Sequence, residues 1–171
     1  MPNETFLNFA YGSNMFTPRL HKRCPSARAQ GIAFLSGHDL RWHKRSTDGS
    51  GKCDIVATKD TKRSVFGVLF EIAMGEKPAL DRLEGLGVGY EEIDVCLIFE
   101  GSETRAKAYR ATSTDPSLKP YSWYHALVVA GAKEHGLPDE YAGRIEQVSS
   151  WEDPDRERHE RNMRLLDGGH A

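Results

Sequence analysis

Cysteine is scarce in this sequence, and none of it lies in a paired motif. The chain of 171 residues has three cysteines, Cys24, Cys53 and Cys96, and no Cys-x-x-Cys arrangement. An odd and sparse set of cysteines does not make the disulfide framework of a small secreted domain. We therefore expect a reducing compartment and a cytoplasmic protein.

Long hydrophobic runs and an excess of positive charge are missing as well. No apolar stretch approaches the roughly 20 residues that a membrane span needs, and the first residues, MPNETFLNF, do not resemble a signal peptide. The formal net charge is −2, whereas a dedicated nucleic-acid binder normally has a strongly basic face. We expect neither a membrane nor a nucleic acid as a partner.

The sequence also gives little indication of a metal site or of a catalytic cysteine. Seven histidines are present, but the chain has no His-Glu-x-x-His motif and no Cys/His set at metal-ligand spacing. Cys96 lies within a predicted strand, and Cys24 precedes a proline in a polar segment, so neither is placed as an activated nucleophile. We expect no metal site.

What is present fits one domain, predicted to cover residues 1–171. Hydrophobic residues make up 39% of the chain and charged residues 28%, as in ordinary globular domains. The length is sufficient for a hydrophobic core without disulfides or metals. Short apolar or alternating runs predict the following strands: 5–11, 30–42 (one or two strands around Gly37), 53–58, 64–73, 91–99 and 104–111.

Two of these runs are informative about burial, and one segment that precedes both is predicted to be a loop. Residues 64–73 are almost continuously apolar, which predicts a strand covered on both faces. Residues 91–99 alternate between apolar and polar side chains, and 104–111 would be their antiparallel partner. Residues 45–52, RSTDGSGK, are polar and rich in glycine.

Two helical patterns lie among the predicted strands, and helices follow one another after residue 116. A short helix is expected at 17–23 with Thr17 as its N-cap, and others at 76–84 and 122–135, the last ending at Gly136. Pro138 is expected to open a further helix, with Ile145 and Val148 in the core. From about residue 153 a charged helix is predicted to expose its charges to solvent. Strands followed by helices favour an α+β fold, here a closed or nearly closed barrel with packed helices.

The stretch NFAYGSNM, residues 8–15, is the first candidate binding feature. An apolar run ends abruptly in Tyr11, Gly12, Ser13 and Asn14. Such a sequence is typical of a plain turn. It also suits a binding loop, because glycine permits close approach of a ligand and successive backbone N–H groups form a cradle for anions.

Glu84 is the second candidate. It follows a helical pattern in which Leu80 lies on the same face, so its carboxylate is expected near the edge of an apolar surface. A partly desolvated carboxylate there suits proton transfer; alternatively, Glu84 simply ends the helix and faces water. The glycines at 85, 87 and 89 follow a helix and precede a strand, which is the wrong order for a dinucleotide-binding loop.

Several separated segments, taken in order, resemble the gamma-glutamylcyclotransferase family. They are FAYGSNM (9–15), LDRLEG (80–85), YEEI (90–93), RAKAYRAT (105–112) and GAKEHGLPDEYAGRI (131–145). The last segment is similar to one in members that act on gamma-glutamyl amino acids. The set covers most of the chain, although residues 45–52 match no feature of the family. The resemblance implies the family's small mixed barrel with packed helices.

The resemblance also implies a reaction and a site. A gamma-glutamyl amino acid or amide would be cyclised to 5-oxoproline with release of the amine, without a metal or a cofactor. Glu84 would be the general acid–base. The substrate-binding residues would be Tyr11, Gly12, Ser13, Asn14, Tyr90 and Tyr109. Either of the last two tyrosines could instead be a core aromatic whose hydroxyl is satisfied within the protein.

Alternatives stay open at this point. The same chemistry would suit a gamma-glutamylamine, glutathione or a gamma-glutamyl-protected metabolite, although the segment at 131–145 points away from glutathione. A barrel that binds a small acidic metabolite without turnover would show the same residues. Dimers occur in related families, so a homodimer is an open alternative, but no feature of the sequence marks an interface.

Overall fold

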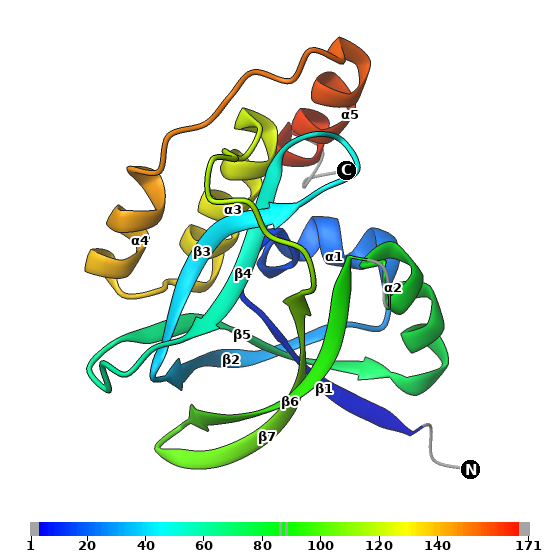
Figure 1. Cartoon of the computed structure of the whole chain (residues 1–171). Coiled ribbons are helices and arrows are strands. Elements are labelled where there is room, and N and C mark those ends of the chain that lie inside the picture. The colour runs from blue at the N-terminus through cyan, green and yellow to red at the C-terminus, as the bar shows by residue number, and fades with distance from the viewer. Residues whose placement is uncertain (1–3, 86, 88, 168–171) are drawn as a thin grey trace.

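Five strands close a barrel, and most of the helices lie above it in Figure 1. The computed structural model describes residues 4–85, 87 and 89–167. The barrel order is β1 (Thr5–Ala10), β5 (Ser64–Ala73), β2 (Arg28–Ser36), β6 (Tyr90–Phe99) and β7 (Ser102–Ala111). Its pairs are antiparallel except at the closure, where β1 and β7 run parallel. The predicted α+β fold with a small barrel is confirmed.

Two further strands form a hairpin that rises from the barrel toward the helices (Figure 1). They are β3 (His38–Arg45) and β4 (Gly51–Ala57). Of the two alternatives around Gly37, one strand or two, the structure has two, and this glycine separates β2 from β3 with a φ of +69°. The predicted loop at 45–52 is shorter than expected, because both ends extend into the hairpin and only residues 46–50 form the turn.

The predicted alternation and burial of the barrel strands are confirmed. In β5, the four consecutive residues from Gly67 to Phe70 are buried, as expected for a strand covered on both faces. In β6, Val95 and Leu97 are buried while Asp94 and Cys96 are exposed. Because β6 and β7 pair along their whole length in one register, the alternation sets which side chains enter the barrel.

The helices are α1 (Thr17–Arg23), α2 (Lys77–Leu83), α3 (Ser122–His135), α4 (Asp139–Glu146) and α5 (Arg156–Asp167). The assignment of Thr17 as N-cap of α1 is wrong. Phe16 occupies the cap position with extended backbone, and the Thr17 N–H is bonded instead by the carboxylate of Glu134 at 2.9 Å. Gly136 does end α3, in the left-handed conformation.

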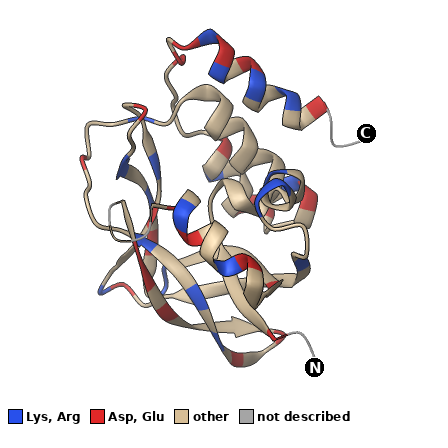
Figure 2. Cartoon of the chain, turned by 90° about the vertical axis from the view of Figure 1, so that its right-hand side faces the viewer, with Lys and Arg blue, Asp and Glu red and all other residues tan. Residues whose placement is uncertain are grey.

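The C-terminal segment departs from the prediction at its start. Helix α5 begins at Arg156, and Figure 2 shows its basic and acidic residues alternating along the exposed helix. Asp153, expected among the solvated charges, has a fully buried side chain that accepts hydrogen bonds from Trp123 and Arg158. Val148, expected in the core, lies beyond α4 and is half-buried. Among the described residues, no helix is both long and apolar enough to cross a membrane.

Candidate functional site

The carboxylate of Glu84 lies beside the loop that follows β1. Glu84 caps the C-terminus of α2, and its Oε1 accepts a hydrogen bond of 2.7 Å from Asn14 Nδ2. Arg23 Nη1 lies 3.1 Å from the same oxygen and 3.2 Å from Asn14 Oδ1. Both bonds end on Oε1, and within the described part of the chain Oε2 has no hydrogen-bond partner. One carboxylate oxygen is therefore held in place by two side chains.

A small cavity of about 50 Å³ connects Glu84 with the loop. All seven residues singled out from the sequence line it, so the structure brings the two halves of the predicted site together. Its other walls come from the barrel, the hairpin and α3. The lining residues are Asn8, Phe9, Ala10, Tyr11, Gly12, Ser13, Asn14, Cys53, Glu84, Tyr90, Tyr109 and Tyr124.

The loop itself turns sharply and leaves backbone donors unused. Residues Ser13–Met15 form a 3₁₀ turn closed by hydrogen bonds from Met15 N to Gly12 O and from Phe16 N to Ser13 O. For the backbone N–H groups of Gly12, Ser13 and Asn14, no acceptor is found among the residues that the structure describes. Three neighbouring donors at the wall of a cavity suit a carboxylate or a developing oxyanion.

Glycine is required where this loop meets its neighbours. A Cβ atom on Gly12 would lie 2.9 Å from Tyr124 Oη and 3.2 Å from Cys53 Cβ. On the other side of the loop, a Cβ on Gly131 of α3 would lie 2.7 Å from both Met15 Cβ and Phe16 N. The loop is thus clamped between the hairpin and α3, with no space for a larger side chain at either glycine.

The tyrosine hydroxyls around the cavity are bonded within the protein. Tyr11 donates to the backbone oxygen of Tyr109, Tyr90 donates to the backbone oxygen of Cys53 at 2.8 Å, and Tyr109 donates to Asp81. Burial raises the pKa of the Tyr11 and Tyr90 hydroxyls well above the usual value. The structure therefore presents the rings of these tyrosines to the cavity, and a hydroxyl contact to substrate stays a prediction.

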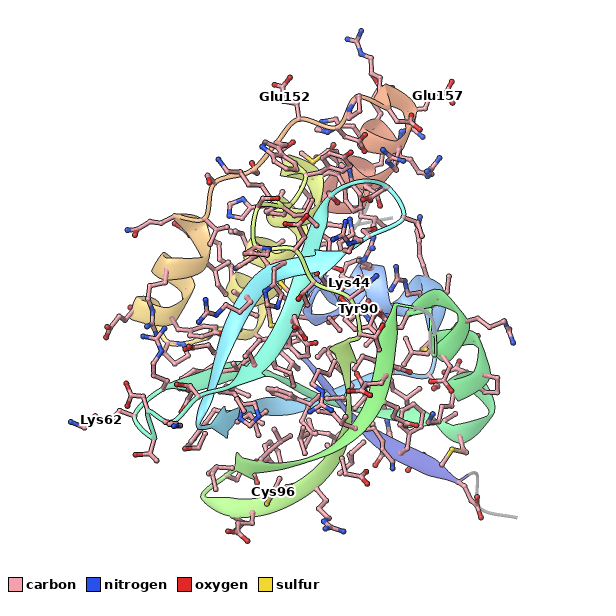
Figure 3. The ribbon with its side chains drawn as sticks, viewed as in Figure 1. Lys44, Lys62, Tyr90, Cys96, Glu152 and Glu157 are labelled. Atoms are coloured by element: carbon pink, nitrogen blue, oxygen red, sulfur yellow. The ribbon has the colours of Figure 1, made fainter. Side chains whose placement is uncertain are left out.

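Burial also keeps the nearby thiols protonated. It raises the pKa of Cys53, which lines the cavity, to about 12, and that of Cys24 to about 11. Cys96 lies at the far end of the barrel from Lys44 and Tyr90, as Figure 3 shows. A nucleophilic thiolate at this site is not favoured by these surroundings.

A larger cavity of about 360 Å³ adjoins the small one, with Ser13, Glu84, Tyr90 and Tyr124 in both walls. It lies between α1, the end of α2 and the β3–β4 hairpin. Basic side chains dominate its lining: Arg19, Arg23, Lys44, Arg45, Lys52 and Arg82. Lys44 and Tyr90 meet here (Figure 3), with the Lys44 Nζ 4.6 Å from the centre of the ring.

Reading the sequence alone missed this basic lining. Arg45 and Lys52 bound the polar segment for which no role was found, and that segment proves to be a hairpin turn beside the cavity. No local pattern marked Arg23, because its partner Glu84 lies 61 positions away. The basic residues come from α1, α2, β3 and β4, so no single segment of the sequence shows that they form a cluster.

The fold and the site define the class of protein: a small barrel with a cavity for a small molecule, in which one carboxylate lies beside a Gly-Ser-Asn loop. A family model described as the AIG2-like family matches residues 64–145. A bovine (Bos taurus) gamma-glutamylcyclotransferase is 33% identical over 151 residues, which cover 85% of this chain and 79% of the relative. The chain belongs to the gamma-glutamylcyclotransferase family.

Solved structures agree with this assignment. A structure described as a gamma-glutamyl cyclotransferase has a TM-score of 0.86 at 29% identity, covering 96% of this chain and all of the other. A human structure described as the uncharacterized protein loc79017 has a TM-score of 0.84 at 30% identity, covering 94% of this chain and 99% of the other. The likeness extends over the barrel and the helices alike.

Proposed function

We propose that this protein cyclises a gamma-glutamyl amino acid to 5-oxoproline and releases the amino acid, with Glu84 as the general acid–base. Relatives named gamma-glutamylcyclotransferases support the reaction class. The observation that carries the proposal is the position of Glu84 in the walls of both cavities. Asn14 and Arg23 hold its Oε1, and Oε2 has no hydrogen-bond partner among the residues that the structure describes.

The chemistry requires little beyond positioning and one proton shuttle. The substrate's α-amine attacks its own γ-carbonyl, so an N–C bond forms in a five-membered ring while the amide C–N bond breaks. The reaction is intramolecular, and holding the chain in a bent conformation removes much of the orientational entropy. Glu84 takes a proton from the α-amine and delivers it to the departing nitrogen, which balances the reaction without water.

The loop would hold the glutamyl end during this step. The N–H groups of Gly12, Ser13 and Asn14, which have no acceptor among the described residues, suit the substrate's α-carboxylate or the oxyanion that develops on the γ-carbonyl oxygen. The rings of Tyr90 and Tyr109 would enclose the aliphatic part of the glutamyl group. The released amine would lie toward the larger cavity, which shares Glu84 with the small one.

The test is substitution of Glu84 by Gln, which keeps an oxygen for the Asn14 donor but removes the exchangeable proton. We expect 5-oxoproline release from gamma-glutamyl-alanine to fall by about 10²–10⁴-fold, the usual contribution of general acid–base catalysis. Glu91→Gln is the matched control, because Glu91 is an exposed carboxylate on β6 paired with Arg110. Full turnover by a folded Glu84→Gln variant would refute the assignment.

A panel of substrates separates the alternatives. Gamma-glutamyl amino acids, a gamma-glutamylamine and glutathione are compared by the 5-oxoproline that each yields. Binding of 5-oxoproline without turnover of any amide would favour a non-catalytic barrel. A cytoplasmic location is part of the proposal, supported by the three free thiols, two of them buried.

A further inference from the structure

The lining of the larger cavity is strongly positive, although the chain as a whole is not. Six basic side chains and a single carboxylate, Glu84, line it, whereas the whole chain has a formal net charge of −2. The cations come from α1, α2 and both strands of the hairpin, so they are separated in sequence and gathered by the fold. Charges of one sign that converge on a concave site raise the local concentration of an oppositely charged ligand.

Only half of these cations are neutralised by a neighbouring carboxylate. Arg23 pairs with Glu84, and Lys52 Nζ lies 2.8 Å from Asp48. Arg45 lies 3.5 Å from Asp115.

For the other three, Arg19, Lys44 and Arg82, no ion pair is found in residues 4–85, 87 and 89–167. Unpaired cations that face one cavity attract an anionic ligand, which would supply the counter-charge.

Two of these unpaired cations are partly withdrawn from water. The Nε atom of Arg19 is buried and has no hydrogen-bond partner among the described residues, while its Nη1 donates to Asn162 at 3.1 Å. Lys44 is half-buried over the ring of Tyr90. Burial lowers the pKa of Lys44, and the carboxylate of Glu84 opposes this shift. An anion bound here would recover much of the cost of burying these groups.

We propose that this cavity is a subsite for the side-chain carboxylate of an acidic leaving amino acid, so that the preferred substrate is gamma-glutamyl-glutamate or gamma-glutamyl-aspartate. The inference rests on the proposed function, because the larger cavity shares Glu84 with the small one and would receive the amine released there. The α-carboxylate of any leaving amino acid occupies one cation. The remaining unpaired cations favour a second carboxylate over a neutral amide.

The test compares two substrates that differ only in charge, gamma-glutamyl-glutamate and gamma-glutamyl-glutamine, by their ratio of kcat/KM. We expect the acidic substrate to be favoured about tenfold by the natural protein, since hydrogen bonds to charged groups contribute about that factor or more. In Lys44→Gln the ratio should fall about fivefold, since one such contact is lost. In Arg82→Gln, which alters an exposed side chain, it should fall about twofold.

Lys62→Gln is the matched control. It removes the same charge from the turn between β4 and β5, far from Lys44 and Tyr90 in Figure 3, and should leave the ratio unchanged. Equal kcat/KM values for the two substrates in the natural protein would overturn this inference and leave the proposed function intact. A ratio that survives in both Lys44→Gln and Arg82→Gln would also overturn it. Absence of turnover with every gamma-glutamyl amide would overturn the proposed function itself.

Discussion

The side-chain amide of Asn14 and the carboxylate of Glu84, 70 positions apart in the chain, meet at 2.7 Å. This bond joins the loop after β1 to the end of α2 and orients the carboxylate toward the cavity. It leaves Glu84 Oε2 available, since Arg23 also bonds to Oε1. The loop after β1 and the end of α2 are thus held together although they are far apart in sequence, and substitution of Asn14 tests this link.

Replacing Asn14 by Ala should lower kcat for gamma-glutamyl-alanine by about tenfold to a hundredfold, because a hydrogen bond to a charged group typically contributes about 1.5–3 kcal/mol. KM should change little if Asn14 mainly positions Glu84. Steady-state kinetics together with a thermal unfolding midpoint distinguish this from a structural effect. A lower midpoint with an unchanged kcat would contradict the positioning role.

Two glycines in helices provide a matched test of how α3 holds the loop. A Cβ on Gly131 would meet Met15 and Phe16 at 2.7 Å, whereas one on Gly143 in α4 would meet nothing within 4 Å. Gly131→Ala should cost about 1–3 kcal/mol in the free energy of unfolding through overpacking and should also reduce turnover. Gly143→Ala should stabilise the protein by up to about 1 kcal/mol.

Urea denaturation of the two variants measures both effects. Equal changes in the unfolding midpoint for Gly131→Ala and Gly143→Ala would show that the close approach of α3 to the loop is not limiting.

Asp153 anchors the C-terminal helix to α3. Its buried carboxylate accepts hydrogen bonds from Trp123 Nε1 at 2.8 Å and from Arg158 Nε and Nη2 at 2.6 Å. Asp153→Ala should lower the free energy of unfolding by about 2–4 kcal/mol, because it leaves the indole N–H and a partly buried guanidinium without their acceptor. Glu152→Ala, a change at the neighbouring exposed residue, is the control.

The same anchor has a predictable pH dependence. The hydrogen bonds from Arg158 hold the pKa of Asp153 well below its usual range. A depressed carboxyl pKa contributes stability that is fully present above the ordinary value near 3.8 and is lost as the pH falls below it. The natural protein should therefore lose more stability below pH about 4 than Asp153→Ala does. Parallel acid-unfolding curves for the two proteins would contradict this.

Lys52 gives the proposed anion subsite a second signature. Burial lowers its pKa to about 8, a shift opposed by Asp48 and reinforced by Arg19 and Lys44. The aromatic rings of Trp123 and Tyr124 also face its ammonium group, at 4.5 and 4.7 Å. The group is therefore charged below pH about 8 and neutral above it.

The preference for gamma-glutamyl-glutamate over gamma-glutamyl-glutamine should accordingly decline as the pH rises through about 8. Titration of the substrate's α-amine is common to both substrates and cancels in the ratio. The free energy of unfolding changes with pH in the opposite direction. The unfolded chain keeps the Lys52 proton up to the ordinary pKa of 10.5, whereas the folded protein loses it near pH 8. Between about pH 8 and 10.5 the contribution of Lys52 to stability therefore grows with pH. A ratio that is flat from pH 7 to 9.5 would rule out a role for Lys52.

Much of the architecture was predictable because its causes are local. Alternation in residues 91–99 and continuous apolarity in 64–73 describe the two faces of a strand, and both strands are found where they were expected. Gly136 ends α3 through its own backbone freedom. The prediction failed at Thr17 and at Asp153, each of which bonds a partner distant in sequence. That partner is Glu134 for Thr17 and Trp123 for Asp153.

By itself, the sequence determined the barrel strands, the helices and the identity of the Gly-Ser-Asn loop and Glu84, since periodicity and turn chemistry act over a few residues. Only the tertiary structure decided that Asn14 and Arg23 hold one oxygen of Glu84, and that Lys44 and Lys52 converge on the adjoining cavity. The reason is physical: hydrogen bonds and charge clustering depend on distances in space, which closure of the barrel sets and which no short stretch of sequence encodes.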